Sequence, residues 1–465
     1  MSWYMQIVQK LLRLRENVNW ESEEERLELL FKLEKYIDEW QDQSLPDIAC
    51  IFRIEELELL LSDSLYTAEF IEFVVRSGYT DEPKRDEDGK PLLRRTTPLH
   101  RVPRCNYEMR PNIVRDLFKI YNRFDLNYAD DSGLTHFHVA CIAGCRDIVT
   151  EFLEVGHDPN SIWQETGDSA LHLILYHGPD YITETLLRRG ANPNLANAEG
   201  LTSLHVICMT INDGAWLDML FKLNDELNQP FQLEVRDKLG NRPLHWALKC
   251  NNERIAKLLL MKSADPNLSN AEGSTPLHVI CDKWFDAGLA KLFFEINDRK
   301  QQTVHINAVD NKGRTPLQLA VNNLLLNVVD LLLDRGADLS NLPFSSASTL
   351  TQEEKGHYFK LVSASGILAI AERLAKSGYE LDRSGALSIM KFFAKYELLF
   401  SSMNFENYLH EDEFISEAKE IMVKPSLSLY DLLQLRPAEA AKLLTYRDYF
   451  DFANCSEKLS KLKSV

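Results

Sequence analysis

Six histidines recur at equivalent places in this 465-residue chain, and histidine is a common metal ligand as well as a general acid and base. They are His100, His138, His172, His205, His245 and His278. His205 and His278 each stand three positions before a cysteine, in the pairs His205/Cys208 and His278/Cys281. A structural zinc site needs four such ligands at one point, whereas repeats hold equivalent residues apart along a stack. We therefore expect each histidine to bond the backbone of a neighbouring loop, and we predict no metal site.

The other residues that could do chemistry occur in no catalytic pattern. Cys141 and Cys145 lie on one face of an expected helix, and a redox role for them is the weaker interpretation. The chain contains no G-x-S-x-G elbow, no Walker loop, no G-x-G-x-x-G and no H-E-x-x-H. No aspartate or glutamate sits in a motif that pairs an acid with a base. The sequence thus predicts a protein that is not an enzyme and needs no cofactor.

Charge and composition exclude two classes of partner. A net charge of −18 argues against nucleic acid and against an anionic membrane, because both need a basic surface. The eight cysteines lie mostly in apolar runs such as HVIC, as reduced cytosolic thiols do. No run approaches the ~20 apolar residues of a membrane span. Residues 1–18 suggest an amphipathic helix rather than a signal peptide. We expect a soluble intracellular protein, located in the cytoplasm or also in the nucleus.

Internal repetition decides the fold class. The stretch PNLANAEGLTSLHVIC at Pro193–Cys208 returns 73 residues later as PNLSNAEGSTPLHVIC at Pro266–Cys281. A tetrad that opens with threonine or a substitute recurs at Thr97, Thr135, Ser169, Thr202, Arg242, Thr275 and Thr315. From Thr135 onward the spacing is 33, 34 or 40 residues, so the 73-residue unit combines a short and a long repeat. Each unit is too small to bury its apolar face alone, and neighbours must stack into one elongated core.

These residues carry a family resemblance. The tetrads TTPLH (Thr96–His100) and RPLHWAL (Arg242–Leu248), and the tails LLRRGANPN (Leu186–Asn194) and LLLDRGADL (Leu331–Leu339), resemble ankyrin repeats. The resemblance covers about residues 86–340. It implies an all-α fold class, a solenoid of about seven ankyrin repeats flanked by N-terminal capping helices and a C-terminal helical domain. It also implies that the chain binds a protein client through its loops and concave face.

The resemblance further points to the loop tips nearest the tetrads as the client-binding surface. By position these include Asp131, Asn197, Glu199, Lys238, Asn270, Glu272, Asn311 and Lys312, with a plain solvated loop as the alternative for each. Two long repeats carry extra residues, in MTINDGAW (209–216) and DKWFDAGL (282–289). Our hypothesis is that these additions contribute to partner selectivity.

Residues 1–62 precede the array, which is expected to occupy residues 63–341. Ser22 and Glu25 have the spacing of a capping box that opens a helix. Apolar residues follow at helical spacing, at Leu27, Leu30, Phe31, Ile37 and Trp40. We expect this N-terminal helical segment to cap the array, with dimerisation as the alternative. FIEFVVRSG (70–78) is expected to form the outer helix of a partial first repeat.

The C-terminal region, residues 342–465, departs from the repeat pattern. Helices are expected at 355–376 and 386–400, before the stretch SLSLYDLLQLRPAEAAKLL (Ser426–Leu444). Ser428 and Asp431 form a second capping box, which places Leu429, Leu432 and Leu433 on one helix face. Arg436 precedes Pro437, where a second helix starts with Ala440, Leu443 and Leu444 facing inward. The two helices form either a lid on the array or a docking site for a partner.

An ankyrin array followed by SLSLYDLLQL resembles the PRANC module, found behind ankyrin repeats in poxvirus and parasitoid-wasp proteins. The segment concerned is about residues 405–460. The resemblance implies an F-box-like domain that engages the Skp adaptor of cullin–RING ubiquitin ligases, although the Leu-Pro-acidic opening of an F-box is missing. The residues it implies are Leu427, Leu429, Tyr430, Leu432 and Leu433, with Pro437 shaping the corner.

Two hypotheses follow for the whole chain. The leading one is a substrate receptor, which holds a client on the ankyrin repeats and docks the ligase adaptor with its C-terminal helices. The alternative is a binding-only ankyrin protein, for example an inhibitor that masks a transcription factor, in which the C-terminal helices only cap the array.

Overall fold

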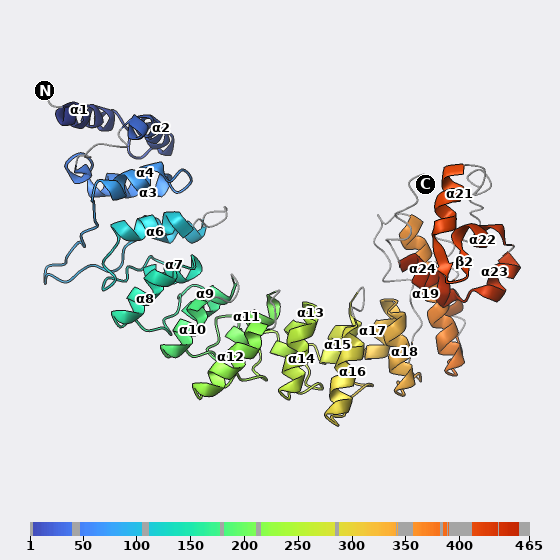
Figure 1. Ribbon diagram of the computed structural model, residues 1–465. Coiled ribbons are helices and arrows are strands. Elements are labelled where there is room, and N and C mark those ends of the chain that lie inside the picture. Colours follow the sequence, from blue (N-terminus) through green and yellow to red (C-terminus); the bar gives the residue numbers. More distant parts are fainter. Residues whose placement is uncertain are drawn as a thin grey trace. The chain divides into compact units, whose positions relative to one another are not determined.

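The computed structural model forms two compact units, Met1–Lys238 and Leu239–Val465. It describes residues 3–39, 47–104, 111–176, 181–210, 215–283, 288–340, 342, 357–381, 385–387, 389, 412–435 and 437–454. These residues are mostly helical, and in each unit successive helix pairs lie side by side (Figure 1). The mainly helical ankyrin architecture expected from the sequence is confirmed. Among the described residues, no helix is both long and apolar enough to cross a membrane.

The first unit begins with four helices: α1 (Trp3–Glu16), α2 (Glu23–Glu39), α3 (Ile54–Asp63) and α4 (Glu69–Arg76). A short 3-10 turn, Ile48–Cys50, precedes α3. On α2 the predicted apolar residues divide, since Leu30 and Ile37 are buried whereas Leu27 and Phe31 are exposed. Trp40 lies outside the described residues. Helix α4 is the outer helix expected at FIEFVVRSG, and the pair α3/α4 packs on the next pair, α5/α6, as a repeat would.

Buried ion pairs fasten these helices together. Arg26 of α2 pairs with Asp63 of α3 at 2.6 Å, and both side chains are less than a tenth exposed. Arg15 of α1 pairs with Glu56 of α3 at 2.7 Å. Arg95, in the loop before α5, binds Glu58 of α3 and also Asp81 at 2.9 Å. The N-terminal segment is therefore held by charge pairs as well as by apolar packing.

The described residues contain seven further helix pairs, each with an inner and an outer helix. They are α5 (Pro98–Arg101)/α6 (Pro111–Ile120), α7 (His136–Ile142)/α8 (Arg146–Glu154), α9 (Ala170–Tyr176)/α10 (Tyr181–Arg188), α11 (Ser203–Met209)/α12 (Ala215–Glu226), α13 (Pro243–Lys249)/α14 (Glu253–Met261), α15 (Pro276–Cys281)/α16 (Leu289–Arg299) and α17 (Pro316–Asn322)/α18 (Leu326–Asp334). A 3-10 turn, Val102–Arg104, follows α5. The first four pairs lie in the first unit and the last three in the second.

The tetrad explains how an inner helix begins. In α15, Thr275 is the N-cap, with an extended backbone, and its hydroxyl accepts from the backbone N–H of His278. Pro276 occupies the first turn, where its missing N–H costs no hydrogen bond. The turn into the outer helix needs a left-handed residue, and Gly144, Asn251 and Leu324 hold it in three repeats with φ of 65°, 58° and 56°.

The outer helices of the two long repeats are the longer ones expected, with 12 residues in α12 and 11 in α16. Residues 211–214 and 284–287 of the two insertions lie outside the described residues.

In the second long repeat, two lysines reach back to the preceding repeat. Lys283 binds the Leu248 carbonyl near the end of α13, and Lys300 donates to the Leu260 and Met261 carbonyls of α14 at 3.0 and 3.1 Å. A cation at a helix C-terminus satisfies carbonyls that have no partner within the helix.

The C-terminal region contains α19 (His357–Lys376), α21 (Asp412–Glu420), α22 (Leu429–Gln434), α23 (Pro437–Leu443) and α24 (Tyr446–Asn454). The all-α fold class is confirmed, and strand content in the described part of this region is small. Met422–Lys424 (β1) and Leu427–Ser428 (β2) form an antiparallel hairpin, with Met422 opposite Ser428. The hairpin explains why SLSLYDLL starts extended, because Leu427 and Ser428 pair with β1 before the helix begins. Of the helix expected at 386–400, only residues 386, 387 and 389 are described.

The last ankyrin pair carries the C-terminal helices. Helix α24 packs along α19, and α19 packs on α18. Arg373 of α19 binds Asp330 and Asp334 of α18 at 2.8 and 2.5 Å. Arg447 of α24 binds the same Asp330. The lid interpretation thus has a physical basis, since α19 and α24 are fixed to the outer helix of the last repeat.

Gly366 sets the closeness of α19 and α24. A Cβ atom on Gly366 would lie 2.9 Å from Cε2 of Phe450, too close for a real contact. We expect Gly366→Val to lower the free energy of unfolding by about 1–3 kcal/mol, the usual cost of overpacking. Urea denaturation would measure the loss. The double variant with Phe450→Leu should recover part of it, whereas additive losses would show that the two positions do not touch.

Candidate functional site

The recurring histidines make one repeated pattern of hydrogen bonds. In the first case, Nδ1 of His100 accepts the backbone N–H of Thr97 at 2.9 Å, and Nε2 bonds the carbonyl of Tyr128 at 3.1 Å. Four others use Nε2 in the same way: His138 with Ser161, His172 with Leu201, His245 with Ser274 and His278 with Arg314, at 2.9–3.2 Å. The prediction that these histidines bond the backbone of neighbouring loops is confirmed for these five.

This pattern requires a neutral ring. Because Nδ1 accepts from an N–H group, Nε2 must carry the proton that it donates to the carbonyl. Burial, the largest influence, lowers the pKa of His138 to about 4 and lowers the pKa of His100, His172 and His278 as well. Both ring nitrogens are thereby committed to the chain. The histidines act as clamps between repeats.

The cysteines that the sequence singled out are buried, but Cys141 and Cys145 do not share one helix as expected. Cys141 lies in α7, which ends at Ile142, and Cys145 is the N-cap of α8. Cys141 and Cys145 are buried, and burial raises the pKa of Cys145 to about 11. A thiol with so high a pKa is almost entirely protonated near neutral pH, and it is the thiolate that reacts. Cys208 and Cys281, which pair in sequence with His205 and His278, are fully buried. The described residues bring together no group of three His, Cys, Asp or Glu side chains that could hold a metal ion.

At the loop tips, three of the predicted asparagines hold the loops themselves. Asn270 accepts the backbone N–H groups of Glu272 and Ser274, both at 3.0 Å, and donates to Asn241 at 2.9 Å. Asn197, one 73-residue unit earlier in the chain, makes the same arrangement and donates to Asp168 at 2.7 Å. Asn311 donates to the carbonyl of Ala271 at 2.9 Å. These amides set the shape of the surface that the other tip residues occupy.

The charged tip residues point into solvent. Asp131 is 91% exposed and lies 3.5 Å from Arg94, which is also exposed. Glu199 and Lys238 form an exposed pair at 3.2 Å. Glu272 and Lys312 are exposed as well. The structure therefore leaves Asp131, Glu199, Lys238, Glu272 and Lys312 accessible, while their role in binding a client stays a prediction.

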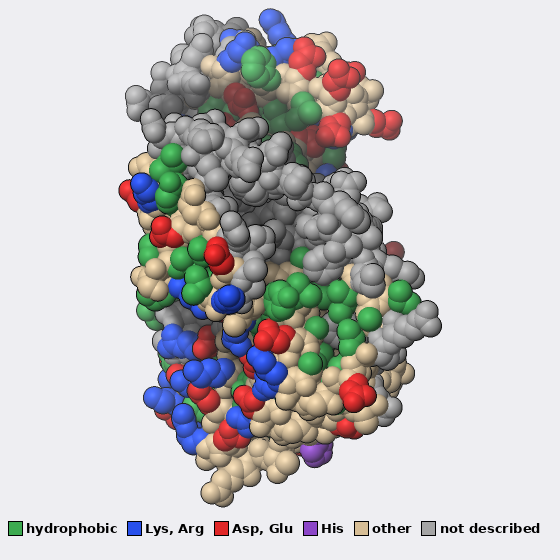
Figure 2. All heavy atoms as spheres, turned by 90° about the vertical axis from the view of Figure 1, so that its right-hand side faces the viewer, with side chains coloured by type: hydrophobic (Ala, Val, Ile, Leu, Met, Phe, Trp, Pro, Cys, Tyr) green, Lys and Arg blue, Asp and Glu red, His purple; other side chains and the backbone are tan. Residues whose placement is uncertain are grey.

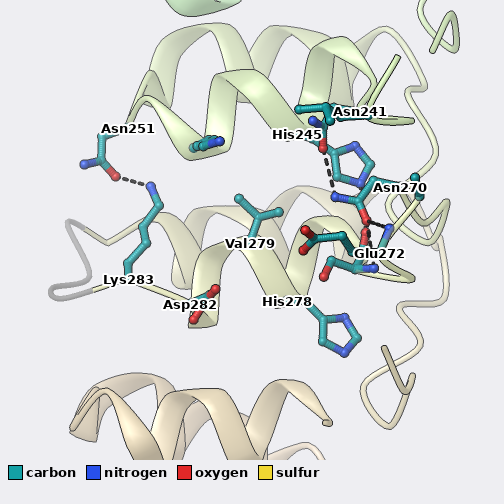
Figure 3. A pocket seen from close by; sticks show the side chains of 13 residues that line it. Asn241, His245, Asn251, Asn270, Glu272, His278, Val279, Asp282 and Lys283 are labelled. Atoms are coloured by element: carbon teal, nitrogen blue, oxygen red, sulfur yellow. Dashed lines mark hydrogen bonds between the residues drawn. The ribbon is translucent and has the colours of Figure 1, made fainter. Parts of the chain in front are cut away.

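In the second unit, a pocket of about 420 Å³ opens between α13, α15 and the loop that carries Glu272 (Figure 3). It includes Asn270 and Glu272, which the sequence had indicated. It also includes Asp282, the first residue of the addition at 282–289 for which the sequence suggested a role in selectivity. Val279, which the sequence had not indicated, lies on the inner helix α15, and its place on an inner helix was the available hint. We call this the Glu272 pocket.

The predicted C-terminal capping box is present. The hydroxyl of Ser428 accepts the backbone N–H of Asp431 at 3.1 Å, and the Asp431 carboxylate accepts the N–H of Ser428 at 3.3 Å. Leu429 packs with Ala418 and Ile421 in a small core of its own.

Other predicted residues of this segment are less enclosed. Tyr430 packs against that core and is partly exposed, as are Leu427 and Leu432. The side chains of Leu433 and Pro437 lie outside the described residues. Of the members whose side chains are described, only Leu429 is buried, and the role of the set in adaptor binding stays a prediction.

Helix α23 corrects one prediction. Ala440 and Leu444 are buried as expected, but Leu443 is 52% exposed. Leu443 therefore lies on the outer side, away from Ala440 and Leu444. Tyr446, at the start of α24, and Met422 on β1 are also exposed. The face of the molecule drawn in Figure 2 shows hydrophobic side chains at the surface among mixed charges.

Comparison with known proteins identifies the class. A family model described as ankyrin repeats in three copies matches residues 99–197, 171–270 and 255–341, which together are more than half of the chain. The chain belongs to the ankyrin-repeat family. The array is therefore a protein–protein interaction module, which is the function that this family of repeats performs.

Individual relatives match less than half of the chain. The human transient receptor potential cation channel subfamily A member 1 is 28% identical over 221 residues, 46% of this chain and 19% of the channel. Pig NF-kappa-B inhibitor alpha is 30% identical over 156 residues, 33% of this chain and 48% of that protein. The fowlpox virus ankyrin repeat protein FPV230 is 28% identical over 180 residues, 39% of this chain and 88% of the viral protein.

The chain spans only 18–19% of the length of the first curated relatives it matches. Among solved structures, the ankyrin repeat domain of Bcl-3 is 23% identical with a TM-score of 0.37, over 45% of this chain and 89% of that domain.

Proposed function

We propose that the chain is a substrate receptor for a cullin–RING ubiquitin ligase. The ankyrin array holds a protein client, and the C-terminal module docks the Skp adaptor, so that the client comes within reach of ubiquitin transfer. The chain does no chemistry and supplies only proximity. Its place is the cytoplasm, or also the nucleus.

The observation that carries this proposal is the C-terminal module itself. The hairpin β1/β2 and the helices α21 and α22 pack around Leu429, and Phe452 of α24 joins this small core. Leu443 and Tyr446, on neighbouring helices, stay exposed although both are large and apolar. A contiguous patch of exposed apolar side chains marks an interaction site, and we propose that these side chains contribute to one. Of the residues predicted from the sequence, we assign adaptor docking to the partly exposed Leu427, Tyr430 and Leu432. We add Leu443 and Tyr446, which the sequence did not indicate for this role.

The second candidate is a binding-only ankyrin protein. The attachment of α19 and α24 to α18 through Arg373 and Arg447 favours it, because a lid needs this contact and nothing more. The likeness to NF-kappa-B inhibitor alpha over a third of the chain points the same way. In this version the C-terminal helices seal the last repeat, and the client is masked rather than degraded.

Proximity labelling in cells separates the two candidates. The full-length chain fused to a biotin ligase would be expressed with and without an inhibitor of cullin neddylation. A substrate receptor predicts that a subset of labelled proteins accumulates when the ligase is blocked. It also predicts that Leu443→Asp/Tyr446→Asp labels the same subset without lowering its abundance. A labelled set whose abundance ignores the inhibitor would contradict the receptor and favour the masking protein.

A further inference from the structure

The Glu272 pocket has walls of mixed chemistry. Its volume of about 420 Å³ falls in the range of about 300–1,000 Å³ that ligand pockets occupy. Val279 lies at its centre, with Glu272 on one side and Asp282 on the other (Figure 3). The exposed Leu239 adds further apolar surface at the rim. A long side chain with an aliphatic stem fits such a shape.

The two lysines that line the pocket already contact other groups of this chain. Lys283 donates to the carbonyl of Leu248 and to the amide oxygen of Asn251, at the end of α13. The ammonium group of Lys249 lies 4.9 Å from the ring centre of Trp246, a cation–π contact. Neither cation pairs with Glu272 or Asp282 in any ion pair of the described residues.

The two carboxylates keep their acceptor capacity. Glu272 is exposed, and the loop around it is held by Asn270 through backbone groups, so that the Glu272 carboxylate is not needed for the loop. Asp282 has Asn323 at 3.5 Å, the outer limit of a hydrogen bond. The neutral histidines of the pocket, His245 and His278, are committed to backbone carbonyls and add no charge. The two carboxylates balance the formal charges of Lys249 and Lys283, which also line the pocket. Because both ammonium groups already contact their own chain, Glu272 and Asp282 are the charged groups left to pair with an occupant.

We infer that the Glu272 pocket receives the side chain of an arginine, or of a lysine, from an extended segment of the client. The inference rests on the proposed function, because it names the kind of client side chain that binds at one pair of neighbouring repeats. The stem of the side chain lies over Val279, and its charged end reaches Glu272 and Asp282. Arginine is favoured over lysine, because its planar fork can serve two carboxylates at once.

A small probe tests the pocket without knowledge of the client. N-acetyl-arginine-amide would be titrated into the full-length chain carrying methyl-labelled valine, and the Val279 methyl signals would be followed by NMR. N-acetyl-citrulline-amide, which has the same shape without the charge, is the matched ligand. We expect a saturable shift with the arginine probe and none at the same concentrations with citrulline. The variant Glu272→Gln/Asp282→Asn should weaken binding by about tenfold or more, as loss of the partner charges does.

Glu199→Gln is the matched control variant. Glu199 occupies the same loop position as Glu272, one 73-residue unit earlier in the chain, and is paired with Lys238. It should leave the arginine shift unchanged. No Val279 shift, an equal shift with citrulline, or an unchanged affinity in the double variant would each overturn the inference.

The two proposals can fail separately. If client binding is wrong, the arginine probe still binds, and if the pocket is wrong, the proximity-labelled clients are the same for Glu272→Gln/Asp282→Asn.

Discussion

Replacing Arg95 by leucine lowers the free energy of unfolding by about 3–5 kcal/mol, the cost of stranding buried charges without their partner. Arg95 is 12% exposed, and it binds Asp81, which is 3% exposed, at 2.9 Å. It also pairs with Glu58 on α3, whose carboxyl has its pKa raised by burial, the largest influence, even with Arg95 present. Tyr128 donates to Asp81 at 3.0 Å and cannot replace a charge. Urea denaturation followed by tryptophan fluorescence measures the loss.

The adjacent residue supplies the control. Arg94 is 77% exposed and lies 3.5 Å from the exposed Asp131, so Arg94→Leu removes the same charge from a solvated pair. Such pairs contribute about 0–1 kcal/mol, and we expect a loss in that range. Equal losses for the two variants would show that Arg95 is not a buried anchor. Arg95→Leu should also free α3 for proteolysis before the later repeats are cut.

Acidification from pH 7 to pH 5 destabilises the array through its histidines. Each clamp needs a neutral ring, and the folded pKa of His138, about 4, lies below the usual 6.5. Between these two values the unfolded chain binds more protons than the folded chain, so that stability falls as the pH falls. The stability lost through His138 reaches about 3 kcal/mol below pH 4, and a large part of that loss is already present at pH 5. His100, His172 and His278 add to it in the same direction.

The chain offers a natural control for this prediction. Gln318 stands at the histidine position of the last repeat, and its side-chain oxygen accepts the N–H of Thr315 at 3.0 Å. His138→Gln should therefore keep the N-cap bond to Thr135 while removing one titrating group. Unfolding free energies measured at pH 7 and pH 5 should differ less in this variant than in the wild type. An unchanged difference would mean that the clamps do not titrate as proposed.

Features that recur with the repeat period could be predicted from the sequence. The tetrad recurs, so the helix pairs, the N-caps and the bonding of the histidines to neighbouring loops could all be predicted. The local pattern Ser428-x-x-Asp431 likewise predicted a capping box, because its partners are three residues apart.

Features built from distant residues escaped prediction. Glu58, Asp81 and Arg95 meet without any shared period, and nothing in the sequence marks them as partners. The hairpin Met422–Ser428 is too short for an alternating pattern to stand out. In α23, Leu443 looked equivalent to Leu444, and only the packing of the module shows that one is exposed and the other buried.

The central claim is that this ankyrin chain docks a ligase adaptor through its C-terminal module, and direct binding tests it most simply. Purified full-length chain and recombinant Skp adaptor would be mixed and examined by isothermal titration calorimetry. Wild type should form a one-to-one complex, and Leu443→Asp/Tyr446→Asp, whose side chains are exposed, should fold normally but lose it. Met261→Asp, at an exposed site on α14, should bind like wild type. Absence of binding by the wild type, or equal binding by Leu443→Asp/Tyr446→Asp, would contradict the claim.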